Sequence, residues 1–267
     1  MATQIHPTAI VDAKIDLGVE VKIGPYAVIE AGCVIGDYCE IRPHAIICKG
    51  TLMGPRNQIG YGVVIGAEPQ DFAYKGTPSR VEIGTGNRIR EYATIHRATA
   101  ENGATLIGNE NFLMGGVHLG HDVQIGSRVI LANNTLLSGH VKVEDGAFLG
   151  GATIVHQHTR IGRLAITRGG TRLGKDVPPF FMATDTNEVS GINRIGLRRA
   201  GFSQETRRAI QAAFDMIYRS NLNVSQALAE LKNKFHGPEI AQLVAFIETS
   251  KRGICRVQRG KSADEED

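Results

Sequence analysis

An aliphatic side chain recurs at every sixth position over most of the first two thirds of the chain. The series runs from Ile5 to Ile65 and returns after two gaps to continue as far as Leu173. Apart from the two hexads that lead into the gaps, 23 of 24 hexads begin with an aliphatic residue, Thr167 being the exception, and 20 carry Ala, Val, Cys or Thr four positions later. Such a period means that each repeat is one structural unit that packs on its neighbours.

A period of six with one large and one small inward residue predicts a parallel β-helix of hexapeptide repeats. Three hexads would close one triangular coil, and stacked coils would pair their backbones at a spacing of about 4.8 Å. Proteins that resemble this pattern wind left-handed. The predicted fold class is therefore mainly β, a left-handed parallel β-helix followed by a C-terminal α-helical domain.

The chain is predicted to divide into a β-helix over 1–180 and a helical domain over 181–267. Residues 71–82 and 96–106 interrupt the repeat and are expected to protrude as loops, which often carry function. Beyond them, three segments show helical signals, beginning with a capping serine at Ser203 and ending with "GPEIAQLVAFIETSKR", where proline occupies a first helical position. Three helices would cover the open end of the β-helix.

The composition argues against membrane spans and disulfides. The longest apolar runs are far shorter than a membrane span, and the N-terminus "MATQIHPTAIVD" lacks the pattern of a signal peptide. The cysteines show neither metal-ligand spacing nor disulfide density, which favours a reducing, cytoplasmic location. They are Cys33, Cys39, Cys48 and Cys255.

Five of the nine histidines lie between positions 118 and 158. Residues one coil apart stack, so this region forms two neighbouring columns of polar residues and glycine. The columns are His121, Gly139 and Gln157, and Asp122, His140 and His158. None of these residues takes the leading inward position of its hexad. With His156 beside them, they predict a polar wall on the outside of the scaffold.

A wall of this kind suits general-base catalysis, because neutral imidazole can take a proton from a hydroxyl group near neutral pH. The glycine of the first column would leave a backbone N–H accessible, and such a group can stabilise an oxyanion. The wall holds no cysteine and no obvious Ser–His pair, which argues against a covalent intermediate. The alternative is that surface histidines only hydrogen-bond their neighbours, and for His118 or His158 alone it is the better interpretation.

Six segments are more distinctive than the repeat itself: "QDFAYKG", "TIHRAT", "HLGHD", "ILANNTLLSGHVKVEDGAFLGGATIVHQ", "DVPPF" and "GLRRAGF". Together they resemble the acyl-carrier-protein–UDP-N-acetylglucosamine O-acyltransferases, the family that catalyses the first step of lipid A synthesis. The resemblance extends over nearly the whole chain. The string HxxHD followed by ANN, GHV and VHQ is much narrower than the hexapeptide repeat.

The resemblance implies that His121 is the general base on the sugar 3-hydroxyl, that Asp122 orients it, and that the Gly139 N–H holds the oxyanion. It places Ile166 and Gly169 beside the acyl chain, with Gly169 where the family sets chain length. Further residues are implied to bind the nucleotide sugar or to line the site. These are Gln70, Asp71, Lys75, His118, His140, His156, Gln157, Asn193 and Arg199.

Two positions depart from the family pattern. The family often has a lysine two residues after "QD", where this chain has Ala73, and Lys75 would take its place from the loop. A second arginine is common beside Arg199, and here that residue is Ala200.

The resemblance also implies the partners. UDP-N-acetylglucosamine would be the acceptor, and the R-3-hydroxyacyl group would arrive on the 4′-phosphopantetheine of acyl carrier protein, so no metal or cofactor of the enzyme itself is expected. The active form would be a homotrimer with its sites between subunits. From Arg194 to Lys261 the chain carries 13 Lys and Arg against 5 Asp and Glu. This basic segment suits an acidic carrier, although a solvated helical face is the commoner origin of a charge cluster, and no nucleic acid is expected.

Three other functions are open to a hexapeptide β-helix. A zinc-dependent protein similar to the carbonic anhydrases would use histidines at a subunit interface, and the His-x-x-His pair beside Asp122 offers ligands. Such a site requires neither the "QDFAYKG" loop nor the C-terminal helices. An amide-forming acyltransferase would normally carry a further N-terminal domain, whereas the repeat here begins at Ile5. A non-catalytic scaffold would have no need for the polar wall.

Overall fold

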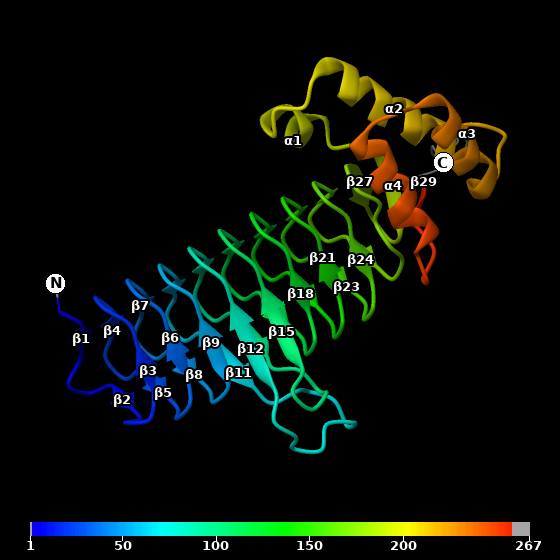
Figure 1. Ribbon diagram of the computed structural model, residues 1–267. Helices are drawn as coiled ribbons and strands as arrows, with labels where there is room; N and C mark the ends of the chain where they lie inside the picture. Colours follow the sequence, from blue (N-terminus) through cyan, green and yellow to red (C-terminus); the bar gives the residue numbers. More distant parts are fainter. Residues whose placement is uncertain (1, 258–267) are drawn as a thin grey trace, which may run out of the picture.

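The computed structural model describes residues 2–257 and consists of a long β-helix with helices at its C-terminal end (Figure 1). The N-terminus lies at the opposite end of the coil from the helices. Each turn of the coil contributes one strand to each of three sheets, which we name A, B and C. The predicted triangular coil is therefore confirmed.

The strands are short, and most contain two residues. Sheet A consists of β1 (Gln4–Ile5), β4 (Lys22–Ile23), β7 (Glu40–Ile41), β10 (Gln58–Ile59), β13 (Arg88–Ile89), β16 (Phe112–Leu113), β19 (Ile130–Leu131), β22 (Phe148–Leu149), β25 (Ile166–Thr167), β27 (Phe181–Thr184), β28 (Glu188–Ile192) and β29 (Arg256–Val257). Sheet B consists of β2 (Ile10–Val11), β5 (Val28–Ile29), β8 (Ile46–Ile47), β11 (Val64–Ala67), β14 (Thr94–His96), β17 (His118–Leu119), β20 (Leu136–Leu137), β23 (Ile154–Val155) and β26 (Arg172–Leu173). Sheet C consists of β3 (Asp16–Leu17), β6 (Val34–Ile35), β9 (Thr51–Met53), β12 (Arg80–Ile83), β15 (Ala104–Ile107), β18 (Gln124–Ile125), β21 (Lys142–Val143) and β24 (Arg160–Ile161).

The register between coils follows the sequence period. Gln4 pairs in parallel with Lys22 in the next coil, a separation of three hexads. Where loops intervene the separation grows, so that Gln58 pairs with Arg88 and Arg88 pairs with Phe112. The hexad frame therefore resumes in phase after each loop, and residues far beyond the loops stay in their columns.

The leading aliphatic residues fill the interior of the coil. Ile29 and Leu131 are 1% and 0% exposed, and full burial of such a side chain is worth about 1.5–3 kcal/mol. Thr167, the exception in the repeat, also points inward. Its Oγ1 lies 2.8 Å from Thr153 Oγ1 and accepts from the Gly150 N–H at 2.9 Å, so its burial leaves no polar group unpaired.

Three asparagines occupy the small inward position in successive coils and form a hydrogen-bonded ladder. Asn57, Asn87 and Asn111 are at most 1% exposed. The Asn87 N–H donates to Asn57 Oδ1 at 2.8 Å, and the Asn111 N–H donates to Asn87 Oδ1 at 2.9 Å. The Val129 N–H completes the ladder by donating to Asn111 Oδ1 at 2.7 Å. The ladder reinforces the coils from which both loops emerge.

Both loops leave the coil between sheet B and sheet C. They comprise residues 68–79 and 97–103, because strands β12 and β15 extend into the ranges that the sequence assigned to loops. These two strands pair with each other along their whole length, from Arg80 opposite Ala104 to Ile83 opposite Ile107. The loops are consequently anchored side by side on adjacent coils.

The chain beyond residue 181 first continues as β structure, because β27 and β28 extend sheet A before any helix begins. The helices that follow are α1 (Arg194–Arg199), α2 (Gln204–Tyr218), α3 (Val224–Lys234) and α4 (Pro238–Glu248). The three helices expected from the sequence are α2, α3 and α4, whereas the six-residue α1 was not predicted. Ser203 caps α2 as expected, accepting from the Thr206 N–H at 3.0 Å. None of the helices in residues 2–257 has the length and apolarity needed to cross a membrane.

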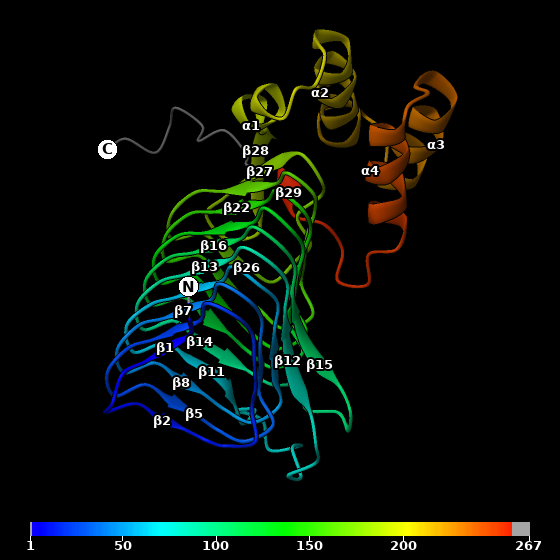
Figure 2. The ribbon, with the colours of Figure 1, turned by 60° about the vertical axis from the view of Figure 1, so that its left-hand side comes forward.

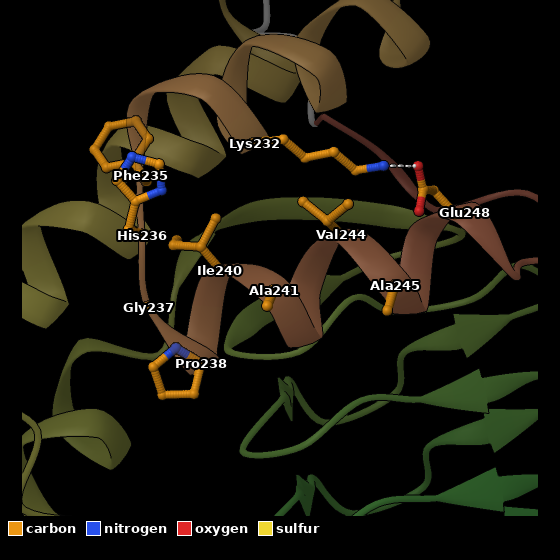
Figure 3. Close-up of a pocket in the computed structure, with 10 residues that line it drawn as sticks. All are labelled: Lys232, Phe235, His236, Gly237, Pro238, Ile240, Ala241, Val244, Ala245 and Glu248. Atoms are coloured by element: carbon orange, nitrogen blue, oxygen red, sulfur yellow. Dashed lines mark hydrogen bonds and ion pairs between the residues drawn. The ribbon is translucent and has the colours of Figure 1, made fainter.

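Helices α2, α3 and α4 lie over the C-terminal end of the coil and to one side of it (Figure 2). Arg160 joins α4 to the coil, because its guanidinium bonds Asp176 Oδ2 at 3.0 Å and donates to the Phe246 carbonyl at 2.6 Å. A mainly apolar groove of about 510 Å³ lies along α3 and α4, next to an ion pair between Lys232 and Glu248 (Figure 3). None of the residues that line this groove belongs to the polar wall.

Candidate active site

The two columns of the polar wall stack as the sequence predicts. The His140 N–H donates to the His121 carbonyl at 2.9 Å, and the His158 N–H donates to the Gly139 carbonyl at 3.1 Å. Asp122, His140 and His158 share a left-handed backbone, with φ of 60°, 59° and 63°. This shared conformation aligns their side chains, and the rings of His140 and His158 stack with centroids 4.6 Å apart.

His121 lies between two carboxylates. Its Nδ1 is 2.8 Å from Asp122 Oδ2, and its Nε2 is 3.4 Å from Asp71 Oδ2 on the first loop. The residue is only 7% exposed, although its ring lies on the outside of the scaffold, as predicted. The ring is surrounded by Asp71 of the first loop, by Asp122 and by the edge of the His140 ring. An imidazole that donates from Nδ1 to a carboxylate keeps its Nε2 lone pair free to accept a proton.

Asp122 is held by the second loop. Thr99 donates to Asp122 Oδ2 through its N–H at 3.0 Å and through its hydroxyl at 2.7 Å. Burial alone would raise the pKa of Asp122, but the hydrogen bonds from His121 and Thr99 outweigh it and keep the pKa below the ordinary carboxyl value. The carboxylate is therefore ionised and fixed beside His121. Sequence reasoning did not single out Thr99, whose only signal was its place in "TIHRAT".

Glycine at position 139 leaves room for the His121 ring, and the backbone conformation there does not by itself require glycine. A Cβ built on Gly139 would overlap the Cε1 and Nε2 atoms of the His121 ring, whereas the Gly139 φ lies outside the left-handed region. Within residues 2–257 the Gly139 N–H donates no hydrogen bond. A backbone donor without a partner thus belongs to the residue against which the imidazole packs, and a ligand atom there can meet both groups.

His140 stands at the open side of the site, with 40% of its side chain exposed. Burial lowers the pKa of His140, the carboxylate of Asp122 acts in the opposite direction, and His158 lowers the pKa further. A groove of about 690 Å³ begins at Asp122 and His140 and continues to the segment after α4. Beside Ala104, Gln124, Thr249 and the Asp176 carboxylate that pairs with Arg160, basic side chains line its remaining length. They are His158, Lys142, Arg160, Lys251 and Arg252.

His118 belongs to a separate pair on the outer face of sheet B. Its Nδ1 lies 2.9 Å from Thr94 Oγ1, and its ring meets the edge of His96 at a centroid distance of 5.3 Å. Burial lowers the pKa of His118, and the neighbouring His96 adds to the effect. His96, which was not predicted as a site residue, is buried and donates from Nδ1 to the Glu68 carbonyl at 2.5 Å. The pair therefore ties the start of the first loop to sheet B.

A buried arginine holds the first loop over His121. Arg97 is 4% exposed and donates to the Gly66 carbonyl at 3.0 Å, to the Glu68 carboxylate at 2.9 Å and to Tyr74 Oη at 3.0 Å. Sequence reasoning missed Arg97, although an arginine directly after an inward-facing strand, at the base of a loop, was a visible signal. Arg97 joins the start of this loop to Tyr74 in its middle, and it thereby fixes the position of Asp71, which lies between them.

The three predicted ligands of the first loop, Gln70, Asp71 and Lys75, differ in their surroundings. Gln70 is exposed beside Asp71. Lys75 is exposed and donates from Nζ to the Phe72 carbonyl of its own loop at 3.2 Å. Of these three, Asp71 alone contacts the polar wall within the described residues.

A second set of predicted residues lies on a different face of the molecule. Ile166, Asn193 and Arg199 line a groove of about 940 Å³ between the outer face of sheet A and α1. The Asn193 side chain is already used in the fold, because it caps α1 and donates to the Leu164 carbonyl at 2.8 Å. Within one chain this face does not meet His121.

The remaining predicted residues are exposed. His156 and Gln157 border the polar wall, and His156 Nδ1 lies 3.2 Å from the Gln157 carbonyl oxygen. Gly169 lies at the corner between sheets A and B. A Cβ built there would have only the Gly151 backbone within 4 Å, with the carbonyl oxygen at 3.3 Å, so a larger side chain would project outward.

A coil of hexapeptide repeats with a histidine, a carboxylate and a glycine N–H gathered at one corner defines a hexapeptide-repeat transferase. The family model described as bacterial transferase hexapeptide (six repeats) matches residues 17–49 and 104–139. The model described as the second domain of UDP-N-acetylglucosamine O-acyltransferase matches residues 176–255. The chain belongs to the acyl-[acyl-carrier-protein]–UDP-N-acetylglucosamine O-acyltransferase family, and it is an acyltransferase.

Relatives of that name match over almost the full length. The protein of Herminiimonas arsenicoxydans is 49% identical over 94% of this chain and 99% of its own length. The protein of Thermodesulfovibrio yellowstonii is 45% identical over 95% of this chain and 99% of its own length. Among solved structures, the UDP-N-acetylglucosamine acyltransferase of Bacteroides fragilis superposes with a TM-score of 0.91 at 42% identity, covering 95% of this chain and 100% of the other. The left-handed β-helix with a helical C-terminal domain is thereby confirmed.

Proposed function

We propose that the protein transfers an R-3-hydroxyacyl group from acyl carrier protein to the 3-hydroxyl of UDP-N-acetylglucosamine, with His121 as general base. The observation that carries this proposal is the arrangement at one coil corner. The His121 ring packs against Gly139, whose N–H is unpaired, while Nδ1 of His121 bonds the ionised carboxylate of Asp122. Relatives at 45–50% identity carry the name of this reaction.

In this mechanism the sugar hydroxyl attacks the thioester carbon as His121 Nε2 takes its proton. The developing oxyanion accepts a hydrogen bond from the Gly139 N–H. Collapse of the tetrahedral intermediate breaks the C–S bond, and the imidazolium returns the proton to the departing sulfur. Asp122 holds the ring in the tautomer that this exchange requires and stabilises the imidazolium. No bound cofactor is needed, because the phosphopantetheine thiol arrives with the donor.

The cysteines support direct transfer over a covalent acyl-enzyme. Burial raises the pKa of Cys33 to about 11 and of Cys255 to about 12, and it also raises the pKa values of Cys39 and Cys48. A thiol in such surroundings is a poor nucleophile, because the thiolate is the reactive form. None of the four is part of the polar wall.

We also propose that the active form is a trimer in which two chains complete each site. Asn193 and Arg199, which the family resemblance implies as site residues facing the nucleotide, lie on the sheet A side of the chain, away from His121. A second copy would therefore have to supply them. The outer face of sheet B favours contact between copies, because exposed aliphatic side chains follow its strands. They are Ile10, Ile46, Leu136 and Ile154.

Light scattering should give three times the chain mass of 28.8 kDa. An arginine on the apolar face of sheet B would be buried without a partner, so Ile46→Arg should lower the assembled fraction and the activity together. Val34→Arg is the matched control, because Val34 is equally exposed, at 37%, but lies on sheet C. A fully active wild-type monomer would contradict the trimer.

The donor is expected to approach along the basic groove that starts at His140. Lys251 and Arg252 at its far end belong to the basic C-terminal segment, which is complementary to an acidic carrier protein. The groove would receive the phosphopantetheine arm and lead its thioester to His121.

Gly169 is proposed to set the acyl-chain length. Because the space beyond its Cα is open, Gly169→Met would project a side chain outward from the corner and block a hydrocarbon tail there. Each buried methylene contributes roughly 0.8 kcal/mol, so excluding several methylenes of the acyl chain should change the preference for donor chain length steeply. We expect lower rates with long 3-hydroxyacyl donors and unchanged or higher rates with short ones, measured together with the melting temperature. An unchanged ratio of the two rates would exclude this role for Gly169.

A further inference from the structure

The polar wall also contains a cluster of potential metal ligands. His121, Asp122 and His140 each offer one ligand atom, and these atoms lie within 4.8 Å of one another. Asp122 Oδ2 is the centre of the cluster, at 2.8 Å from His121 Nδ1 and 3.7 Å from His140 Nε2. Two imidazole nitrogens and one carboxylate oxygen thus lie close together.

The nature of these donors selects a particular class of ion. Imidazole nitrogen suits zinc and its neighbours among the transition metals, whereas magnesium and calcium require mostly oxygen ligands. Three protein ligands with one open position are the usual set for an accessible zinc ion. The cluster also lies where an ion can enter, because Asp122 and His140 line the open groove of about 690 Å³.

We propose that His121, Asp122 and His140 form an inhibitory site for a divalent transition metal such as Zn²⁺. Zinc–nitrogen and zinc–oxygen bonds are about 2.0–2.2 Å long, so the three donors must converge by a small movement. His140 can supply that movement, because 40% of its side chain is exposed. The ion would act as an inhibitor, because it would occupy the proposed base His121 in an acyl transfer that itself uses no metal.

Metal binding at Nδ1 would change the tautomer of His121. The proton that Nδ1 donates to Asp122 in the free protein is displaced, and the neutral ring must then carry its proton on Nε2. Asp71 is in place to accept it, since Asp71 Oδ2 lies 3.4 Å from Nε2. A metal-bound histidine that donates its other N–H to a carboxylate is the usual arrangement around zinc. In this state Nε2 has no lone pair for the sugar hydroxyl, so the base is disabled.

Calorimetric titration of the chelator-treated full-length protein with Zn²⁺ tests binding without any substrate, and the absorption spectrum of bound Co²⁺ reports the coordination. We expect one ion per chain in the wild type. Asp71→Asn removes the carboxylate that would accept the Nε2 proton, and loss of such an outer-shell partner should weaken Zn²⁺ binding by about 10–100-fold. His140→Ala removes a ligand itself, so it should weaken Zn²⁺ binding by at least about tenfold. His44→Ala is the matched control and should bind as the wild type does, because His44 is exposed and stacks on Tyr26 away from the cluster.

The second measurement is inhibition, and this part of the inference rests on the proposed function. Zn²⁺ should lower wild-type turnover, chelator should restore it, and His140→Ala should require at least tenfold more Zn²⁺ for the same fractional loss. Wild-type protein that binds no stoichiometric Zn²⁺, or folded His140→Ala protein that binds it with unchanged affinity, would overturn the site. Tight binding without inhibition would keep the site and refute His121 as the base, so the two failures are distinguishable.

Discussion

Replacing His121 by alanine should lower turnover on the order of 10²–10⁴-fold, the usual contribution of a positioned general base. The variant should fold normally, because the ring lies outside the coil interior and is surrounded by Asp71, Asp122 and His140 rather than by the aliphatic core. The loss should appear mainly in kcat, since the proton is transferred in the transition state. Steady-state rates with a 3-hydroxyacyl carrier and UDP-N-acetylglucosamine, beside a melting curve, measure it.

His6→Ala provides the control for this experiment. His6 is an exposed histidine on the first coil, bonded through Nδ1 to Thr8 Oγ1 at 2.9 Å, and has no contact with the polar wall. It should keep wild-type turnover. Near-normal turnover in a well-folded His121→Ala protein would show that His121 is not the base. It would favour the alternative that the histidines of the polar wall only hydrogen-bond their neighbours.

Replacing Gly139 by alanine should have an effect nearly as large, for a steric reason. The new methyl group would overlap Cε1 and Nε2 of His121, so the ring must turn away from Asp122 or the two coils must separate. A displacement of about 1 Å at a reacting group can cost on the order of 10²-fold in rate. We therefore expect turnover to fall by about that factor, with a smaller loss of thermal stability. The same kinetic assay and melting curve measure both quantities.

Gly174→Ala is the matched substitution. Its Cβ would meet only the Asn187 side chain, at ordinary contact distances of 3.6 and 3.8 Å, and its φ is outside the left-handed region. This variant should resemble the wild type in rate and stability. If Gly139→Ala keeps normal turnover, then neither the position of the His121 ring nor the donor geometry at residue 139 can be as critical as proposed.

The parts of the protein that could be predicted are those governed by the repeat. Once the period of six was recognised, stacking of residues one coil apart followed from geometry, and with it the contacts of His121 with Gly139 and of His140 with His158. Phase was preserved across both loops because each coil pairs only with its neighbours. The helices α2, α3 and α4 were predictable from local caps and spacing, whereas α1, with six residues, carries too little periodic signal.

The tertiary structure decided how the corner becomes a site. The burial of His121 depends on the first loop, whose path is set by Arg97 through bonds to Gly66, Glu68 and Tyr74. The fixing of Asp122 depends on Thr99, twenty-three residues away in the sequence. Loops have no period, so their path follows from a few long-range hydrogen bonds that no local pattern encodes.

The separation of the predicted residues into two faces was likewise a tertiary result. Sequence motifs grouped Asn193 and Arg199 with His121, but the first two lie against the outer face of sheet A and His121 lies at another corner. The repeat determined which residues share a column, because stacking depends on neighbours in the coil. It could not determine which columns meet across a groove or between chains, because those contacts depend on the faces that the folded coil presents.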